Sequence, residues 1–320
     1  MKTDQQTPPW GLWLTGLAPH IYAIIFWLLS LLAFRQPLSS LARLALHDEL
    51  ATHILLIPLI SAFFIYLERK RIFQTSRYCP SLGVPLLLTV GVLWYSLKTP
   101  LFSLTEMDRL SAVAALIALV WIAAFLLFYG TRSLKAAAFP LLFLFLMIPL
   151  PATLLAHIVS VLQKGSATTC YALFQLIGVP VIRHGFQFSL PGIDIEVAEQ
   201  CSGIHAALSL FIAGLPAQHV LLPETWKKVC FTLSILPIAI FKNAVRIVTI
   251  SWLGIHVNPD FFHGPLHRRG GIPFSLVALA LMAVLLWLLR RPLAVPGTHH
   301  LSRRIGSDLA WNDCVKRSRG

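Results

Sequence analysis

The sequence predicts an all-α membrane protein, a polytopic bundle of about eight transmembrane helices with a short extended, β-like segment on its exterior side. Of the 320 residues, 57% are hydrophobic and only 12% are charged, which is about half the charged fraction of an ordinary soluble domain. Runs such as Leu110–Phe128 and Phe274–Leu289 contain no charge, and a helix needs roughly 20 mainly apolar residues to cross a bilayer. Because these runs are apolar throughout, they lack the alternating pattern of a transmembrane β-barrel.

Eight apolar windows are predicted to be the spans of the bundle. They cover residues 18–34, 51–67, 81–97, 110–129, 136–156, 203–222, 229–253 and 273–290. No small-residue cleavage site precedes the first window, so we expect it to be a retained span and not a signal peptide. Residues 1–290 are expected to form one integral membrane domain. Residues 291–320, which are basic and interrupted by Pro and Gly, are expected to form a flexible cytoplasmic tail.

The distribution of Lys and Arg predicts which side of the membrane each loop faces, because basic residues accumulate in cytoplasmic loops. With the N-terminus inside, the inside segments contain 16 basic residues and the outside segments 8, while Lys242 and Arg246 lie within the seventh span. This two-to-one excess favours cytoplasmic N- and C-termini. Basic residues that fix the topology also explain the net charge of +13. The expected partner is therefore the lipid bilayer and not nucleic acid.

The cysteines do not indicate a metal or disulfide framework. They are odd in number and include no CxxC pair. The five are Cys79, Cys170, Cys201, Cys230 and Cys314. No metal and no cofactor are expected.

Residues from about 157 to 202 face the exterior in this topology. The first part, "HIVSVLQKGSATTCYALFQLIG", either lies along the membrane interface or fills the bundle. The second part, "VPVIRHGFQFSLPGIDIEVAEQ", is rich in β-branched residues and interrupted by Gly and Pro, which predicts a short β-hairpin or extended loop. Cys201 follows at the outer end of the sixth span, so its thiol is expected to face the exterior.

Arg246 lies inside the seventh span, about seven residues, or roughly 10 Å, from the outer end. A charge within a membrane costs a few kcal/mol, and this side chain can extend toward a wet cavity at the outer surface. Asn243 lies three residues earlier on the same helical face. If Arg246 only reached lipid headgroups, the presence of Asn243 on the same face would be poorly explained, because an amide prefers a protein partner. Lys242 is expected to point elsewhere and to be snorkelling or structural.

An exterior loop after the seventh span, "HVNPDFFHGPLHRRGGIPF", contains three histidines, His256, His263 and His267. Imidazole suits proton transfer near neutral pH, and His267 lies six residues before Pro273, where the eighth span begins. A His in a surface loop is usually only solvated. Three of them without a fixed helical spacing are weak evidence for a metal site.

Cys201, His267 and Arg246 together match the needs of acyl transfer by a thiol. The thiolate attacks a carbonyl, the imidazole takes and returns a proton, and a fixed cation stabilises the oxyanion. A nearby cation and the start of a helix both favour thiolate over thiol. Ser202 and Gly203 are expected to supply free backbone N–H groups as a second oxyanion donor.

Three motifs in order resemble the exosortase/archaeosortase family. "VAEQCSGI", "PIAIFKNAVRI" and "LHRRGGIPF" match the Cys-Ser-Gly, Asn-x-x-Arg and His-x-x-x-Gly motifs of that family. "LFLFLMIPLP" and "GVPVIRHGFQFSLPGIDIEVA" are similar to the region before the first motif, and "LHDELATHILLIPLI" around His53 is similar to an N-terminal element. The resemblance spans roughly residues 45–290. Two features depart from the pattern of the family, namely Lys242 before Asn243 and the basic pair Arg268–Arg269. They put the substrate subgroup in doubt.

The resemblance implies a membrane cysteine protease or transpeptidase, associated in the family with exopolysaccharide systems. Such enzymes act on proteins with a C-terminal sorting signal, made of a short motif, a transmembrane helix and a basic cluster. It implies Cys201 as nucleophile, Arg246 as stabiliser of thiolate and oxyanion, and His267 as general acid and base. Asn243, Ser202, Gly203 and His53 are implied as substrate-binding or supporting residues. The implied location is the inner membrane, with the active site on the periplasmic side; the oligomeric state is left open.

Three other interpretations stay open from the sequence. A transporter or channel would use Arg246 as a mid-membrane substrate site, with broken helices in matched halves. A catalytically inert membrane protein would join Cys201 to Cys170 in a disulfide, which thiol labelling would detect. An intramembrane protease would hydrolyse its substrate rather than transfer it, because water and an amine can both resolve an acyl-enzyme.

Overall fold

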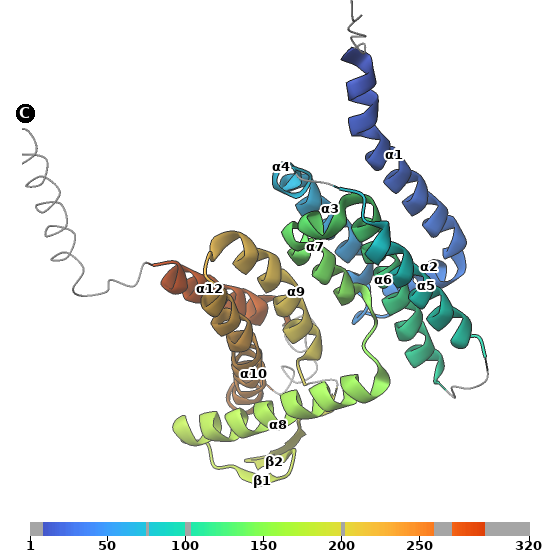
Figure 1. Ribbon diagram of the computed structural model, residues 1–320. Coiled ribbons are helices and arrows are strands. Elements are labelled where there is room, and N and C mark those ends of the chain that lie inside the picture. The colour runs from blue at the N-terminus through green and yellow to red at the C-terminus, as the bar shows by residue number, and fades with distance from the viewer. Residues whose placement is uncertain (1–8, 75–76, 100–103, 200–201, 259–270, 292–320) are drawn as a thin grey trace, which may run out of the picture.

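The computed structural model describes residues 9–74, 77–99, 104–199, 202–258 and 271–291, which form a helical bundle with one small sheet (Figure 1). The N-terminal half contains α1 (Pro9–Ala33), α2 (Arg35–His47), η1 (Thr52–Leu55), α3 (Leu56–Leu67), α4 (Arg69–Ile72), α5 (Pro80–Ser96), α6 (Glu106–Ala136), α7 (Ala138–Phe143) and η2 (Leu144–Met147). The C-terminal half contains α8 (Ala152–Leu176), β1 (Ile182–His184), β2 (Gln187–Leu190), β3 (Ile193–Glu196), α9 (Ile204–Leu221), α10 (Thr225–His256) and α12 (Gly271–Arg290).

The helices confirm a multi-pass membrane bundle, but the described residues support fewer spans than the eight windows. Four helices are long and apolar enough to cross a membrane, namely α6, α9, α10 and the Pro273–Arg290 part of α12. Two bent helix pairs raise the number to six if each pair is one span. Residues Thr52–Leu67 and Pro80–Ser96 form shorter apolar helices.

The window at 136–156 is wrong as a single continuous helix. The chain leaves η2 at Met147, passes two prolines, Pro149 and Pro151, and re-enters a helix at Ala152. The two helical parts are bent by 94°. Proline has no N–H to donate and disfavours a helical residue before it, so an apolar window that contains both prolines cannot stay straight.

The core of the N-terminal half forms where α6 packs against its neighbours. Phe125 and Tyr129 of α6 pack with Ile72 of α4 and Leu141 of α7. A second cluster joins α2, η1 and the other end of α6, with Ile57 and Ile117 completely buried. These clusters fix the half as one packed unit.

The C-terminal half is organised around α10, which packs against α8, α9 and α12. Phe231 and Ile235 of α10 pack with Leu210 of α9 and Met282 of α12. At the other end of α10, an antiparallel sheet of order β1-β2-β3 lies beside α8 (Figure 1). Its residue Phe188 is fully buried in a cluster with side chains of α8 and α10. The extended segment predicted before Cys201 therefore corresponds to strands that pack on the helices.

The last turn of α9 joins the two halves. His219 Nε2 lies 2.7 Å from Glu68 Oε1, and its ring stacks on Phe139 of α7 with centroids 3.8 Å apart and planes within 5°. Glu68 is also paired with Arg71. Ile212 and Leu215 of α9 pack against the cluster around α2 and η1.

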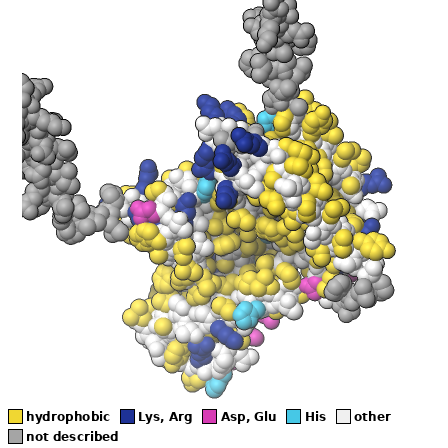
Figure 2. Space-filling view, viewed as in Figure 1, with side chains coloured by type: hydrophobic (Ala, Val, Ile, Leu, Met, Phe, Trp, Pro, Cys, Tyr) yellow, Lys and Arg dark blue, Asp and Glu magenta, His cyan; other side chains and the backbone are white. Residues whose placement is uncertain are grey.

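On the face shown in Figure 2, one group of Lys and Arg side chains lies beside a broad hydrophobic band, and further Lys and Arg side chains lie over the sheet and at the sides. Lys and Arg side chains gather over α4, a broad hydrophobic band crosses the middle, and the sheet lies at the opposite end of the molecule (Figures 1 and 2).

Candidate active site

Two motifs of the C-terminal half meet where Gly203, at the start of α9, contacts Asn243 of α10. Two predicted catalytic residues, Cys201 and His267, lie outside the described residues. The structure describes Ser202 and Gly203, which follow Cys201 in the chain, and Asn243 and Arg246 of α10. These residues define the geometry of the candidate site.

Gly203 is the N-cap of α9 and contacts Asn243 of α10. Its φ is +84°, in the left-handed region that only glycine adopts readily. A methyl group on its Cα would lie 3.0 Å from Asn243 Cγ and 3.2 Å from Asn243 Oδ1. Both the backbone conformation and the close approach therefore require glycine, and the turn after Cys201 packs directly on the helix that contains Arg246.

Ser202 differs from its expected role. Its side chain is only 1% exposed, and its backbone N–H donates to Glu199 O at 3.0 Å. The expectation of a free N–H at Ser202 is therefore wrong, because the chain makes a turn before α9 that uses this donor. Within the described part of the chain, the buried Ser202 Oγ has no hydrogen-bond partner.

Arg246 and Lys242 occupy successive turns of α10. Arg246 is half-buried, and Lys242 is 3% exposed and close enough to Arg246 for their charges to repel. Of its two expected roles, snorkelling or structural, the burial of Lys242 favours the structural one, and Lys242 does not point away from Arg246, because residues four apart share a helix face. Arg246 thus has a second cation one turn deeper in the bundle.

Two polar residues of α8 that sequence reasoning missed support the site. Asn243 Nδ2 donates to Ser166 Oγ at 3.1 Å, and Gln163 Nε2 donates to the backbone oxygen of Val197 at 2.6 Å. All four residues are buried. Residues 157–178, which contain Gln163 and Ser166, were expected either to lie along the membrane interface or to fill the bundle. The face of α8 with Gln163 and Ser166 fills the bundle. The sequence signal that could have identified Gln163 and Ser166 is their three-residue spacing in an otherwise mostly apolar helix.

His53 lies in η1, in the N-terminal half. It lies beside the backbone of Leu50 and Leu146 and lines a cavity of about 50 Å³. Leu155 of α8 and Leu208 of α9 line the same cavity. His53 therefore faces the C-terminal half next to the first two turns of α9.

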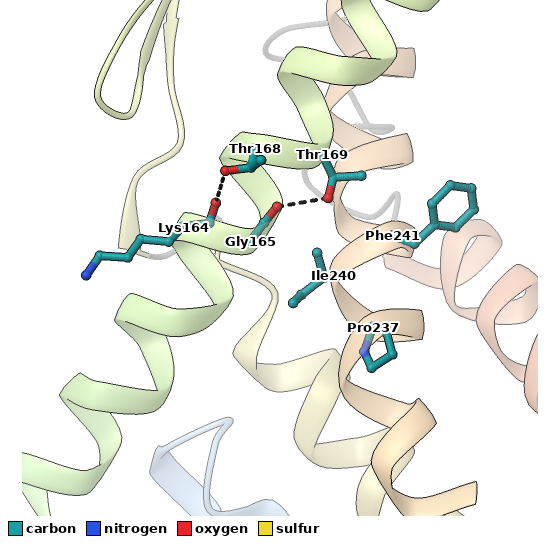
Figure 3. A pocket seen from close by; sticks show the side chains of 7 residues that line it. All are labelled: Lys164, Gly165, Thr168, Thr169, Pro237, Ile240 and Phe241. Carbon is teal, nitrogen blue, oxygen red and sulfur yellow. Dashed lines mark hydrogen bonds between the residues drawn. The ribbon is translucent and has the colours of Figure 1, made fainter. Parts of the chain in front are cut away.

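A larger groove of about 510 Å³ follows the crossing of α8 and α10 (Figure 3). Lys164, Gly165, Thr168, Thr169, Pro237, Ile240 and Phe241 line it. The two Thr hydroxyls donate to backbone oxygens of their own helix (Figure 3). The groove is therefore mainly apolar. A methyl group at Gly165 would lie 2.6 Å from Ile240 Cδ1, so glycine allows the close crossing of the two helices.

Two of the alternative interpretations find little support in these elements. Cys170 is a free, fully buried thiol whose Sγ donates to Ala244 O at 3.7 Å, so the structure does not contain the disulfide of the inert alternative. The transporter alternative places its substrate at broken helices. Arg246 lies within the continuous helix α10, whereas the bends fall between α1 and α2 and between η2 and α8.

The fold and the site define a multi-pass helical membrane protein with a cluster of buried polar side chains at one end of its C-terminal half. The family model described as transmembrane exosortase (Exosortase_EpsH) matches residues 45–288, so the chain belongs to the transmembrane exosortase family. This confirms the family indicated by the three motifs. Neither the curated proteins nor the solved structures compared with the chain contain a match.

Proposed function

We propose that the protein is a cysteine protease or transpeptidase that cleaves proteins with a C-terminal sorting signal at the outer face of the cytoplasmic membrane. Membership of the exosortase family supports this function. The observation that favours it most is the contact of Gly203 with Asn243. Cys201 lies two residues before Gly203, and Arg246 lies one helical turn after Asn243. Nucleophile and cation thus belong to two segments that touch.

In the proposed reaction, the Cys201 thiolate attacks the scissile carbonyl carbon, and a sulfur–carbon bond forms. Arg246 stabilises the oxyanion, to which the buried Ser202 hydroxyl is a further donor. His267 donates a proton to the leaving amine as the carbon–nitrogen bond breaks, which leaves a thioester on Cys201. Water or an acceptor amine then attacks the thioester and loses a proton to His267, and the thiolate is released.

The proposed topology places Cys201 on the periplasmic side of an inner membrane, with both termini in the cytoplasm. The Lys and Arg side chains over α4 (Figure 2) favour a cytoplasmic location for that end. The sheet and the start of α9 lie away from it (Figure 1). A scissile bond between a sorting motif and its transmembrane helix would then meet Cys201 just outside the hydrocarbon core.

The first test is processing of co-expressed proteins with several candidate C-terminal signals, followed by gel shift. We expect wild-type protein to give a shift that Cys201→Ala and Arg246→Ala abolish, at equal membrane abundance. Cys230→Ala is the matched control, because Cys230 is an exposed thiol near the N-terminal end of α10. A shift that persists in Cys201→Ala would exclude Cys201 as the nucleophile.

Labelling of whole cells tests the topology separately. A membrane-impermeant maleimide is expected to modify Cys201 in cells with a permeable outer membrane, while Cys79 near α4 reacts only after the inner membrane is opened. Cys201→Ala identifies the labelled site by mass spectrometry. Reaction of Cys79 from outside, with Cys201 protected until lysis, would reverse the proposed orientation.

A further inference from the structure

One face of α8 has a row of buried polar side chains outside the three motifs. Gln163, Ser166 and Cys170 follow each other at spacings of three and four residues, which places them on one side of a helix. Each makes a hydrogen bond to a different part of the candidate site. Among the described residues, the Thr169 hydroxyl on another face of α8 bonds only a backbone oxygen of that helix, whereas the Thr168 hydroxyl also accepts from Arg183 Nη1.

Gln163 holds the segment that leads into Cys201. Its Nε2 donates to Val197 O at 2.6 Å, and the Val197 N–H donates to Phe186 O at 3.0 Å. Both main-chain groups of Val197 are therefore fixed, four residues before the nucleophile. Because polar groups inside a membrane protein find few competing water partners, this bond restrains the backbone just after β3, which ends at Glu196.

Ser166 fixes the amide of Asn243 from the opposite side. Asn243 Nδ2 donates to Ser166 Oγ at 3.1 Å, and this bond orients Asn243 Oδ1 toward Gly203, where an added methyl group would approach it to 3.2 Å. Ser166 is 0% exposed and Asn243 is 1% exposed. The Asn243 side chain is thus held between α8 and the turn after Cys201.

We infer that Gln163 and Ser166 are positioning residues, which hold the Cys201 segment and the Asn243–Arg246 turn of α10 in register through a shared helix, α8. The inference rests on the proposed function. α8 is suited to this because Gly165 lets it cross α10 closely at the same level. Displacement of a reacting group by about 1 Å can lower a rate by about 100-fold, so loss of either bond affects chemistry without removing a catalytic residue.

The test measures two quantities on the full chain, namely processing of a sorting-signal protein in cells and the pH dependence of Cys201 alkylation by iodoacetamide in detergent, quantified by mass spectrometry. Gln163→Glu keeps the shape of the side chain and replaces its donor by an acceptor. Ser166→Ala removes the oxygen that Asn243 requires. Thr169→Ala is the matched control on α8, because its hydroxyl bonds only its own helix.

We expect Gln163→Glu and Ser166→Ala to slow processing by about 10- to 100-fold. We also expect slower alkylation of Cys201 at neutral pH, with the same limiting rate at high pH, because a thiolate farther from Arg246 forms at higher pH. Thr169→Ala should match wild type in both measurements. A purely structural role would lower the amount of folded protein and leave the alkylation profile of the folded fraction unchanged.

Ser166→Cys, which nearly preserves volume, replaces Ser166→Ala if that variant does not fold. Wild-type alkylation profiles and processing rates in the folded variants would overturn the inference while Cys201-dependent processing stands. Processing that persists in Cys201→Ala would instead overturn the proposed function. The two failures are therefore distinguishable.

Discussion

Gly203 shows how a single residue without a side chain determines the candidate site. A left-handed φ of +84° and a close approach to Asn243 coincide at this position. We expect Gly203→Ala to lower stability by about 1–3 kcal/mol through backbone strain alone and to lower processing more than 10-fold by displacing Asn243. Thermal unfolding in detergent and the gel-shift assay measure the two effects.

Gly192→Ala is the control that separates strain from contact. Gly192 has a similar φ of +82°, but a methyl group there meets no atom within 4 Å. This variant should lose stability without losing processing in proportion. If both variants lower processing equally at equal abundance, the contact with Asn243 has no specific role.

Lys242 places a second positive charge in the interior of the C-terminal half. Among the described residues, no hydrogen bond or ion pair involves its ammonium group, and its side chain is 3% exposed. A mostly buried charge that the described residues do not pair costs a few kcal/mol inside a membrane protein. We therefore expect Lys242→Met, which keeps the volume and removes the charge, to raise stability by about 1–3 kcal/mol, measured as a higher unfolding temperature in detergent.

Lys227→Met is the matched control for this prediction. Lys227 is equally buried on the same helix, but its Nζ lies 3.0 Å from Glu224 Oε1, so removal of its charge should give no gain. A lower unfolding temperature for Lys242→Met than for wild type would show that the Lys242 ammonium stabilises the bundle.

At the scale of elements, the apolar windows predict the ends of α9 and α12 well. The windows 203–222 and 273–290 correspond closely to α9 and to α12, because polar or Gly- and Pro-containing loops flank each apolar run. The window 136–156 fails because hydropathy sums composition and does not record where Pro149 and Pro151 turn the chain. α8 was not predicted as one helix of 25 residues, since its polar face reduces its mean hydropathy.

The motifs identify Cys201, Asn243, Arg246 and His267 as candidates, since short spacings in the sequence are sufficient for them. The supporting contacts could not be predicted in the same way. Ser166 and Asn243 are 77 residues apart in the chain, and Gln163 and Val197 are 34 apart. Such pairs depend on the bend before α8 and on the crossing of α8 with α10, which are properties of the tertiary structure.

Phe188 is the largest fully buried side chain of the sheet before Cys201. Phe188 is fully buried and lies 6.1 Å from Phe174 of α8 between ring centroids. We expect Phe188→Ala to lower stability by about 3–5 kcal/mol, as loss of a buried Phe does, and to expose residues 182–196 to limited proteolysis. Ile182→Ala, at an exposed position of β1, should change neither quantity. Equal protease resistance of Phe188→Ala and wild type would contradict the proposed packing of the sheet.

At the scale of the whole molecule, α9 connects the candidate site with the opposite end of the bundle. It begins just after Cys201 and ends beside Glu68 and Phe139, in the N-terminal half. His53 faces its first two turns through the small cavity with Leu208. The position of the nucleophile therefore depends on how firmly the N-terminal half holds the far end of this helix.

His219 makes two contacts that substitution can separate. His219→Ala loses both the stacking on Phe139 and the bond to Glu68, whereas His219→Phe keeps an aromatic ring and loses only the bond. A hydrogen bond to a charged group contributes about 1.5–3 kcal/mol and an aromatic pair about 0.5–1.5 kcal/mol. We therefore expect unfolding temperatures in the order wild type, His219→Phe, His219→Ala, with processing decreasing in the same order. His205→Ala, at an exposed position of α9, controls for the loss of an imidazole. A wild-type unfolding temperature for His219→Ala would show that other contacts hold the two halves together.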